Sequence, residues 1–332
     1  MKSRLALLFV GLLCLQVQGQ SIERFSIDSG GAIATAGGIE IMYTIGEVNV
    51  AERTSPTVSL SEGFINAPLK ISVNPAVFLQ GPLFNPATPG LMNDILREDN
   101  HLPTTSPYGD GMTVNANVFN LGGASGTGPA SDNIVDWVLI ELRSDGDSSN
   151  ILASRSALLQ RDGDVVGLDG LSDVVLFVSP KNYYVSIKHR NHLGIMTSTS
   201  VALSDTAAVV DFTDANNQIT NGTNAQTTFG APTDVVAMWA GDVNGNGQVK
   251  YLGPNNDSVG IKDNVLDPVN GNPTGSNFFA YTGYDNADVN MNGQIKYLGP
   301  NNDTNSIKDI ILAHPDNGTL SNFFPIFAQI PN

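Results

Sequence analysis

The C-terminal part of the chain contains one segment twice. Residues 241–266 read GDVNGNGQVKYLGPNNDSVGIKDNVL and residues 287–312 read ADVNMNGQIKYLGPNNDTNSIKDIIL, so 18 of 26 aligned positions are identical at a spacing of 46 residues. The tetrapeptide Ser-Asn-Phe-Phe also recurs, at 276–279 and 321–324. Two copies are too few for a solenoid, in which many repeated units stack. The repeat therefore predicts a duplicated module over residues 236–332.

Each copy begins with the order Asp-x-Asn-x-Asn-Gly, which has the ligand spacing of a calcium-binding loop. In an EF-hand-type loop, positions 1, 3 and 5 provide side-chain oxygens, position 6 is a glycine at a sharp turn, and position 7 provides a backbone carbonyl. The next acid follows an inserted YLGPNND segment, which we expect to return it to the ion. The predicted calcium ligands are Asp242, Asn244, Asn246, Gln248 and Asp257 in the first copy and Asp288, Asn290, Asn292, Gln294 and Asp303 in the second.

A short helix is predicted after each loop, over residues 258–266 and 304–312. Asp257 and Asp303 directly precede these helices, so each could instead cap a helix N-terminus. Asp and Asn also form turns without any metal. The complete order occurring twice favours calcium, with an affinity on the order of 10⁻⁴–10⁻³ M because each loop has only two carboxylates.

The loop followed by a helix, present twice, resembles the dockerin modules of extracellular bacterial proteins. The match covers the first half of each loop, whereas a dockerin loop has an acid at position 12 and this chain has Gly253 or Gly299. The resemblance implies a small calcium-stabilised module of helices and loops. It also implies an alternative function, as an accessory or catalytic component of an extracellular polysaccharide-degrading system.

The acidic residues are mostly aspartate, with 25 Asp against 7 Glu. Asp favours turns, helix caps and cation sites, whereas Glu favours helices, so this composition argues against a charged helical bundle. The formal net charge is −16, with 16 Lys and Arg against 32 Asp and Glu. The charge argues against nucleic acid or an anionic membrane as the main partner, and calcium fits better.

Residues 1–19 have the pattern of a secretory signal peptide. Lys2 and Arg4 precede an apolar run over 5–15, and a small residue, Gly19, follows at the expected cleavage site. The run is too short to span a bilayer, which needs about 20 helical residues. We therefore expect a protein that is secreted or displayed at the cell surface. Cleavage would remove Cys14, the one cysteine, although a lipid anchor on Cys14 is an alternative.

The remaining chain has the patterning of a mostly β protein. Residues 20–70 alternate apolar stretches with glycine turns and predict an N-terminal β module. Residues 71–213 predict an Ig-like β-sandwich, and residues 214–235 a polar linker. The predicted strands of the sandwich are 71–80, 114–121, 134–143, 174–178, 183–188 and 196–203, with one helix at 91–97.

Two stretches resemble parts of exported Bacteroidota proteins. The segments GGAIATAGGIEIMYTIGEV and SLSEGF resemble an N-terminal module of secreted surface proteins from that group. The block IVDWVLIELR, followed by ASRSALLQRDGDVV and NYYVSIKHRNHLGIMT, resembles a domain of exported proteins that carry the label hemagglutinin. Both resemblances imply a cell-surface protein, without implying a catalytic activity.

Candidate catalytic groups are few. Glu141 with Asp162 or Asp164 could form a glycosidase pair, but we expect Glu141 to alternate outward with Arg143 and the two aspartates to form a hairpin turn. His189 and His192 could form a zinc pair only if a turn brings them together. The basic cluster 188–191 could contact an acidic glycan or a partner strand, but we expect it to pair with nearby Asp.

No catalytic site is therefore predicted, and the leading function is binding or assembly in adhesion or an extracellular matrix. The expected partners, besides calcium, are a surface glycan, another protein, or a second copy joined by strand addition from residues 20–70.

Overall fold

The computed structural model describes residues 30–36, 39–45, 52–55, 58–61, 69–122, 128–228 and 234–331. The chain divides into two compact units, Met1–Pro68 and Leu69–Asn332. Strands account for 33% and helices for 15% of the chain, which confirms the mostly β fold. The predicted signal peptide and Cys14 lie outside the described residues. Among the described residues, no helix has the length and apolar character needed to cross a membrane.

The first unit contains two β-hairpins. β1 (Gly30–Ala36) pairs antiparallel with β2 (Ile39–Ile45), and β3 (Glu52–Ser55) pairs antiparallel with β4 (Val58–Ser61). Short paired strands agree with the predicted β character of this region, but β1 begins at Gly30 and Gly31, which were expected to form a turn.

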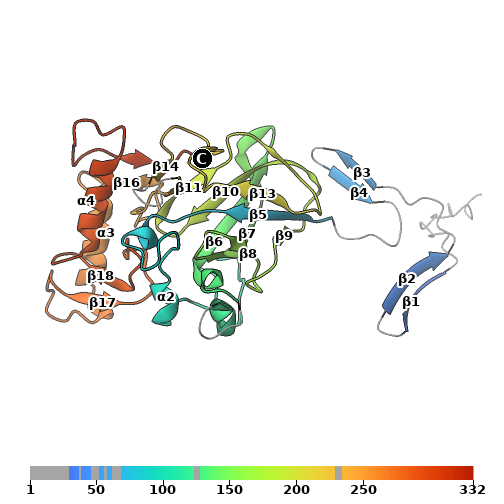
Figure 1. The fold of residues 1–332 in the computed structure, drawn as a ribbon, viewed down its shortest axis with the longest axis horizontal. Coiled ribbons are helices and arrows are strands. Elements are labelled where there is room, and N and C mark those ends of the chain that lie inside the picture. Colours follow the sequence, from blue (N-terminus) through green and yellow to red (C-terminus); the bar gives the residue numbers. More distant parts are fainter. Residues whose placement is uncertain are drawn as a thin grey trace, which may run out of the picture. The chain divides into compact units, whose positions relative to one another are not determined.

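The second unit begins with two sheets (Figure 1). The larger sheet has the strand order β11-β10-β6-β7-β8, and β12 also pairs with β10. In the smaller sheet, β5 lies between β13, which is parallel to it, and β9, which is antiparallel. The bounds are β5 (Ile71–Ala76), β6 (Ile134–Ser144), β7 (Asp147–Gln160), β8 (Val165–Val166), β9 (Val174–Leu176), β10 (Lys181–His189), β11 (His192–Met196), β12 (Val201–Leu203) and β13 (Ala208–Asp211).

Both sheets contribute to one hydrophobic core. Trp137 and Val185 from the larger sheet belong to the same buried cluster as Ile71 and Val210 from the smaller sheet. Trp137 is fully buried, as its expected role as a core anchor requires, and its indole N–H donates to the backbone oxygen of Pro103.

Three predicted strands differ clearly from the structure, and β7 was not among those predicted. The strand expected over 71–80 ends at Ala76, as β5. Residues 114–121 were expected to form a strand, but they contain a 3₁₀ helix, η2 (Ala116–Asn120), because the side chain of Asn115 caps its first turn. The predicted strand 196–203 is divided into the end of β11 and β12, since the backbone N–H of Ser198 donates to Ile219. The helix α2 (Ile95–Glu98) covers only the last three residues of the range 91–97 that was expected to be helical, and it extends one residue beyond that range. Two further 3₁₀ helices are η1 (Gly81–Leu83) and η3 (Ala130–Asp132).

The duplicated segment forms two helices that lie side by side, α3 (Asp257–Leu266) and α4 (Asp303–Ala313), as predicted (Figure 1). Their apolar residues form a second core with Trp239. This part of the unit also contains three short strand pairs and a 3₁₀ helix: β14 (Gln226–Thr228) with β15 (Val236–Met238), β16 (Gln248–Val249) with β19 (Ile326–Phe327), β17 (Ala280–Thr282) with β18 (Gln294–Lys296), and η4 (Pro268–Asn270).

The predicted linker, residues 214–235, runs inside the second unit. Asn221 donates from its backbone to Met196 of β11 and from its side chain to the backbone oxygen of Gln329. Gln226 donates to the backbone oxygen of Phe212, at 2.8 Å. These bonds attach the segment to the sheets and to the C-terminal residues.

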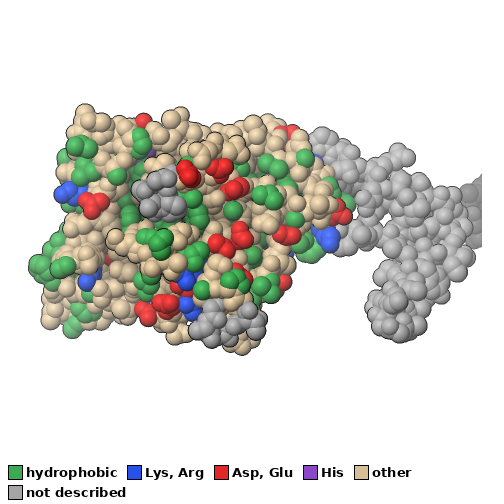
Figure 2. All heavy atoms as spheres, in the orientation of Figure 1, with side chains coloured by type: hydrophobic (Ala, Val, Ile, Leu, Met, Phe, Trp, Pro, Cys, Tyr) green, Lys and Arg blue, Asp and Glu red, His purple; other side chains and the backbone are tan. Residues whose placement is uncertain are grey.

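Charged side chains are spread over the surface. On the face shown in Figure 2, Asp and Glu side chains lie in several separate groups, with few Lys and Arg among them. This distribution agrees with the strongly negative formal charge of −16.

Candidate metal centre

The first loop of the repeat winds around the carboxylate of Asp242. Oδ1 of Asp242 accepts the backbone N–H of Asn246 at 3.0 Å, and Oδ2 accepts that of Gly247 at 3.0 Å. Asn244 Oδ1 accepts the same Asn246 N–H at 3.1 Å, and Asn246 Oδ1 accepts the N–H of Gln248 at 2.9 Å. Gly247 has a φ of +77°, which explains why this turn position is glycine. Three predicted ligands are therefore held in one tight loop.

Asp257 returns to this loop from the start of α3. Its Oδ1 accepts the backbone N–H groups of Val243 at 2.9 Å and of Asn244 at 3.3 Å, and its Oδ2 accepts that of Lys250 at 2.8 Å. The side chain is completely buried. The inserted segment thus brings a second carboxylate beside the first turn of the loop.

The alternative prediction that Asp257 caps α3 is wrong, because the preceding residue, Asn256, caps the helix. The Asn256 side chain accepts the backbone N–H of Val259 at 3.0 Å and donates to the backbone oxygen of Gly253 at 2.6 Å. Asn302 caps α4 in the same way, through the N–H of Asn305 at 2.8 Å. Asp257 and Asp303 therefore direct their carboxylates to the loops.

The second loop repeats the main hydrogen bonds of the first. Asp288 accepts the backbone N–H groups of Asn292 and Gly293, at 3.0 and 2.8 Å. Asp303 accepts those of Val289 and Lys296, both at 2.9 Å. Asn290 and Asn292 accept backbone N–H groups at 3.1 and 2.8 Å. Gln248 and Gln294 lie where the two loops end, at the first residues of β16 and β18.

Burial makes these carboxylates unusually difficult to ionise. It raises the pKa of Asp242 to about 6. Burial, together with the charge of Asp242, raises the pKa of Asp257 to about 7. Burial also raises the pKa of Asp288, and the pKa of Asp303 is raised by burial and by the charge of Asp288. In the part of the chain that the structure describes, none of the four forms an ion pair with a basic side chain.

The residues of each loop suit a hard cation. Each carboxylate oxygen can accept more than the one or two backbone bonds that it already has, and calcium prefers carboxylate, amide and carbonyl oxygens. Each loop offers two carboxylates and two asparagine oxygens. No group of three or more His, Cys, Asp or Glu side chains that could hold a metal occurs among the described residues.

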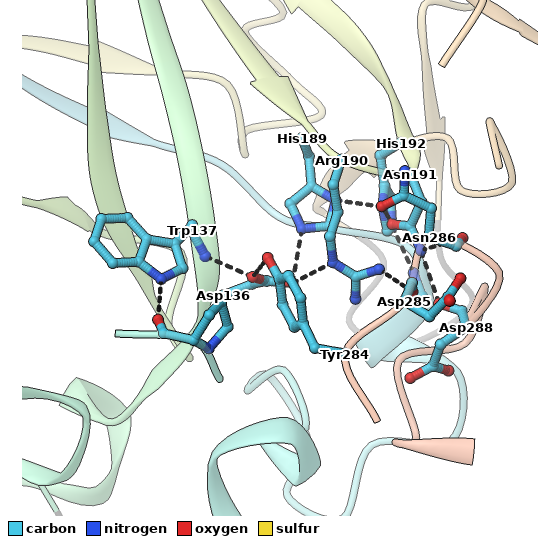
Figure 3. Close-up of polar contacts among 12 residues, drawn as sticks. Asp136, Trp137, His189, Arg190, Asn191, His192, Tyr284, Asp285, Asn286 and Asp288 are labelled. Carbon is cyan, nitrogen blue, oxygen red and sulfur yellow. Dashed lines mark hydrogen bonds and ion pairs between the residues drawn. The ribbon is translucent and has the colours of Figure 1, made fainter. Parts of the chain in front are cut away.

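A buried polar network holds the second loop against the larger sheet (Figure 3). At its centre, Asp136 of β6 accepts hydrogen bonds from Arg190 Nε at 3.0 Å and Tyr284 Oη at 2.7 Å, and contacts His189 Nε2 at 3.1 Å. Burial opposes the ionisation of Asp136, but the charge of Arg190 and the bonds from His189 and Tyr284 outweigh it and lower its pKa to about 2. The carboxylate is therefore ionised and paired.

The turn between β10 and β11 connects this network to the repeat. Asn191 donates from its side chain to the backbone oxygens of Asp288 at 2.7 Å and Asn286 at 3.2 Å. Arg190 donates to the backbone oxygen of Asp285. A predicted calcium ligand, Asp288, is thus positioned by a hairpin of the larger sheet.

The same turn brings His189 and His192 together, with ring centroids 4.7 Å apart. Their Nδ1 atoms lie 2.9 Å apart, His189 Nε2 contacts Asp136, and His192 Nε2 accepts the backbone N–H of Gly81 at 3.1 Å. Burial lowers the pKa of both imidazoles. All four ring nitrogens are used within the protein, which does not suit a zinc pair.

The expected outward alternation of Glu141 and Arg143 is wrong. Both side chains are about 3% exposed and form an ion pair at 2.8 Å. The C-terminal segment explains their burial, because Arg143 Nη1 donates to the backbone oxygen of Pro331 at 2.7 Å. Lys188 also pairs with Glu141 at 2.8 Å, and not with the expected Asp, whereas Arg190 of the same cluster does pair with Asp136.

Asp162 and Asp164 lie in the turn between β7 and β8, as expected. Sequence reasoning missed Asp136 and Tyr284. An acid within the apolar strand segment IVDWVLIELR was the signal available for Asp136.

Searches for relatives match no family model, no curated protein and no solved structure.

Proposed function

We propose that each loop binds one Ca²⁺ and that calcium stabilises the second unit. The observation that carries the proposal is the burial, in each loop, of two carboxylates without an ion pair. Burying a charge is costly unless another charge neutralises it, and a bound divalent cation does this. The ligands are the side chains of Asp242, Asn244, Asn246 and Asp257 with the carbonyl of Gln248, and in the second loop Asp288, Asn290, Asn292 and Asp303 with the carbonyl of Gln294.

Calcium makes the protein a stable scaffold outside the cell, where the ion is abundant. The sequence of residues 1–19 supports secretion or display at the cell surface. The two sheets with a shared core support an Ig-like sandwich, and the paired loops and helices support a dockerin-like module. We propose a binding or assembly role in adhesion or an extracellular matrix.

A catalytic role is not part of the proposal. Glu141, the strongest candidate for an acid catalyst, is buried and paired with both Arg143 and Lys188. Asp162 and Asp164 belong to a hairpin turn. The contacts of these carboxylates therefore fit a structural role better than a catalytic role.

Calcium removal tests the proposal. The metal-free protein should melt at a lower temperature than the same protein in 5 mM CaCl₂, because an ion that binds only the folded state stabilises it by mass action. Replacing CaCl₂ with three times its concentration of KCl keeps the ionic strength equal and is the control. A melting temperature that does not change with calcium, together with no heat of binding in a calcium titration, contradicts the proposal.

A further inference from the structure

A hollow of about 450 Å³ lies beside the second loop. Asn290 and Asn292 of the loop form one wall, and Asn305 and Ser306 of α4 form another. Phe84 and Asn85, which follow η1 (Gly81–Leu83) in the sequence, close a third side. The volume lies within the range of about 300–1,000 Å³ that is typical of ligand pockets.

Polar groups that face the hollow have unused hydrogen-bonding capacity. The side chains of Asn85, Asn305 and Ser306 form no hydrogen bond within the described part of the chain. Each amide offers two donors and one acceptor oxygen, and each hydroxyl both donates and accepts. The hollow therefore presents mixed donors and acceptors, which suits a ligand rich in hydroxyl groups.

The backbone around the hollow is fixed before any ligand binds. Asn93 donates to the backbone oxygen of Asn85 at 3.4 Å and accepts the backbone N–H of Ala87 at 2.9 Å, which holds the loop that contains Asn85. On the opposite side, the cap of α4 by Asn302 holds the first turn that contains Asn305 and Ser306. A preformed site spends less of its interaction free energy on ordering.

The first copy of the repeat lacks the polar side chains that line the hollow on α4. Val259 and Gly260 stand where the second copy has Asn305 and Ser306, although 18 of the 26 aligned positions are identical. The calcium-loop positions Asp242, Asn244 and Asn246 are matched by the same residue types in the second copy. The two copies therefore agree at the proposed metal ligands and differ at the wall of the hollow.

Charge limits what the hollow can accept. Asp309 is the one charged side chain among its lining residues, and no Lys or Arg lines it. An anion would find no basic partner, and an apolar ligand would leave the asparagine amides without partners, at a cost in free energy. Phe84 adds one apolar wall, against which the carbon face of a sugar ring can pack.

We infer that this hollow binds a neutral saccharide, with hydrogen bonds from its hydroxyl groups to Asn85, Asn305 and Ser306. The inference rests on the proposed function, because the wall formed by Asn290 and Asn292 belongs to a loop that calcium would hold closed. It adds a ligand class and a location that the calcium sites alone do not specify.

Calorimetric titration in 5 mM CaCl₂ tests the inference. The probes are the methyl glycosides of glucose, galactose, mannose and N-acetylglucosamine and the corresponding β-linked trisaccharides. At least one probe should bind, and N305V/S306A should weaken it about tenfold, because two hydrogen bonds are lost. V259N, the reverse substitution at the matching position of the first copy, should leave binding unchanged. A panel without binding, or binding that N305V/S306A leaves intact, overturns the inference.

Calcium binding is measured separately, by melting temperature, on the same proteins. If calcium stabilises the protein and no saccharide binds, the inference alone fails. If calcium has no effect but a saccharide binds and N305V/S306A weakens it, the calcium function fails and the saccharide site stands. N305V/S306A should keep the calcium response of the parent protein, which shows that the variant is folded.

Discussion

Asp257 is the first residue of α3 but does not cap the helix. Because Asn256 is the cap, the carboxylate of Asp257 is available to the loop. Asn256 accepts the orphan N–H of Val259, while Asp257 accepts N–H groups from Val243 and Lys250 across the loop. The sequence could not separate these roles, because Asn and Asp are equally good helix caps. Only the three-dimensional path of the inserted segment decides between them.

The first prediction at this scale is that Asp257→Asn removes one of two calcium sites. The substitution preserves size but eliminates one of the two negative charges of the first loop, so calcium stoichiometry should fall from two to one per chain. Asp263→Asn is the matched control, because it makes the same change at an exposed position of α3. Calcium titration calorimetry measures both. Two ions bound by Asp257→Asn would mean that Asp257 is not a ligand.

The second prediction concerns pH. In the metal-free protein the folded-state pKa values of Asp242 and Asp257 are about 6 and about 7, above the ordinary aspartate value near 4. The folded state therefore holds these protons more tightly than the unfolded state, and stability should be lost as pH rises from about 4 to about 7. Calcium replaces the protons, so it should stabilise more at higher pH.

Melting temperatures at pH 5.0 and 7.5 test this dependence. The protein is freed of metal on a chelating resin and measured with and without 5 mM CaCl₂. The gain from calcium should be clearly larger at pH 7.5 than at pH 5.0. An equal or smaller gain at pH 7.5 is incompatible with protons and calcium competing for these carboxylates.

The β10–β11 hairpin is the element that joins the larger sheet to the repeat. Its turn carries Arg190, which pairs with Asp136 inside the sheet region, and Asn191, which donates to the backbone of Asp288. The sequence predicted the strand β10 and the pairing of the basic residues with Asp, but it placed the next strand at 196–203 and not at His192–Met196. It did not identify the partners, because Asp136 meets His189 through the pairing of β6 with β10, and meets Tyr284, 148 residues away, only through tertiary packing.

The third prediction tests this network by a double-mutant cycle. Arg190→Met should lower the free energy of unfolding by about 3–5 kcal/mol, because it leaves the buried charge of Asp136 without its main partner. Arg190→Met/Asp136→Asn should lose less than the sum of the two single variants, since no unpaired charge remains. Urea denaturation in saturating calcium measures all four proteins. Additive losses would show that the two residues are not coupled.

At the scale of the whole molecule, the sequence predicts the individual elements of the second unit better than the long-range contacts that join them. Local signals were sufficient for the mostly β composition and the two helices, since glycine turns and helix caps act over a few residues. The attachment of residues 214–235 and of the C-terminal segment to the sheets depends on contacts such as Asn221 to Gln329 and Arg143 to Pro331. No local pattern encodes such contacts.

These contacts lead to the fourth prediction, that the sheets and the repeat unfold together. Trp137 belongs to the core of the sheets and Trp239 to the core of the repeat, so each tryptophan reports on one core. Residues 69–332 form one compact unit, and the hairpin, the C-terminal segment and β14–β15 all link the two cores. Unfolding one core would expose the other, which favours a single cooperative transition.

Trp137→Phe leaves Trp239, in the core of the repeat, and Trp239→Phe leaves Trp137, in the core of the sheets. Within each single-tryptophan variant, the fluorescence midpoint in urea should coincide with the midpoint from far-ultraviolet circular dichroism, which reports on all the strands and helices. Adding calcium should move both probes by the same amount, although only the repeat contains the proposed sites, because stabilising one part of a cooperative unit stabilises all of it. Separate midpoints, or a calcium response confined to Trp239, would show that the two cores unfold independently.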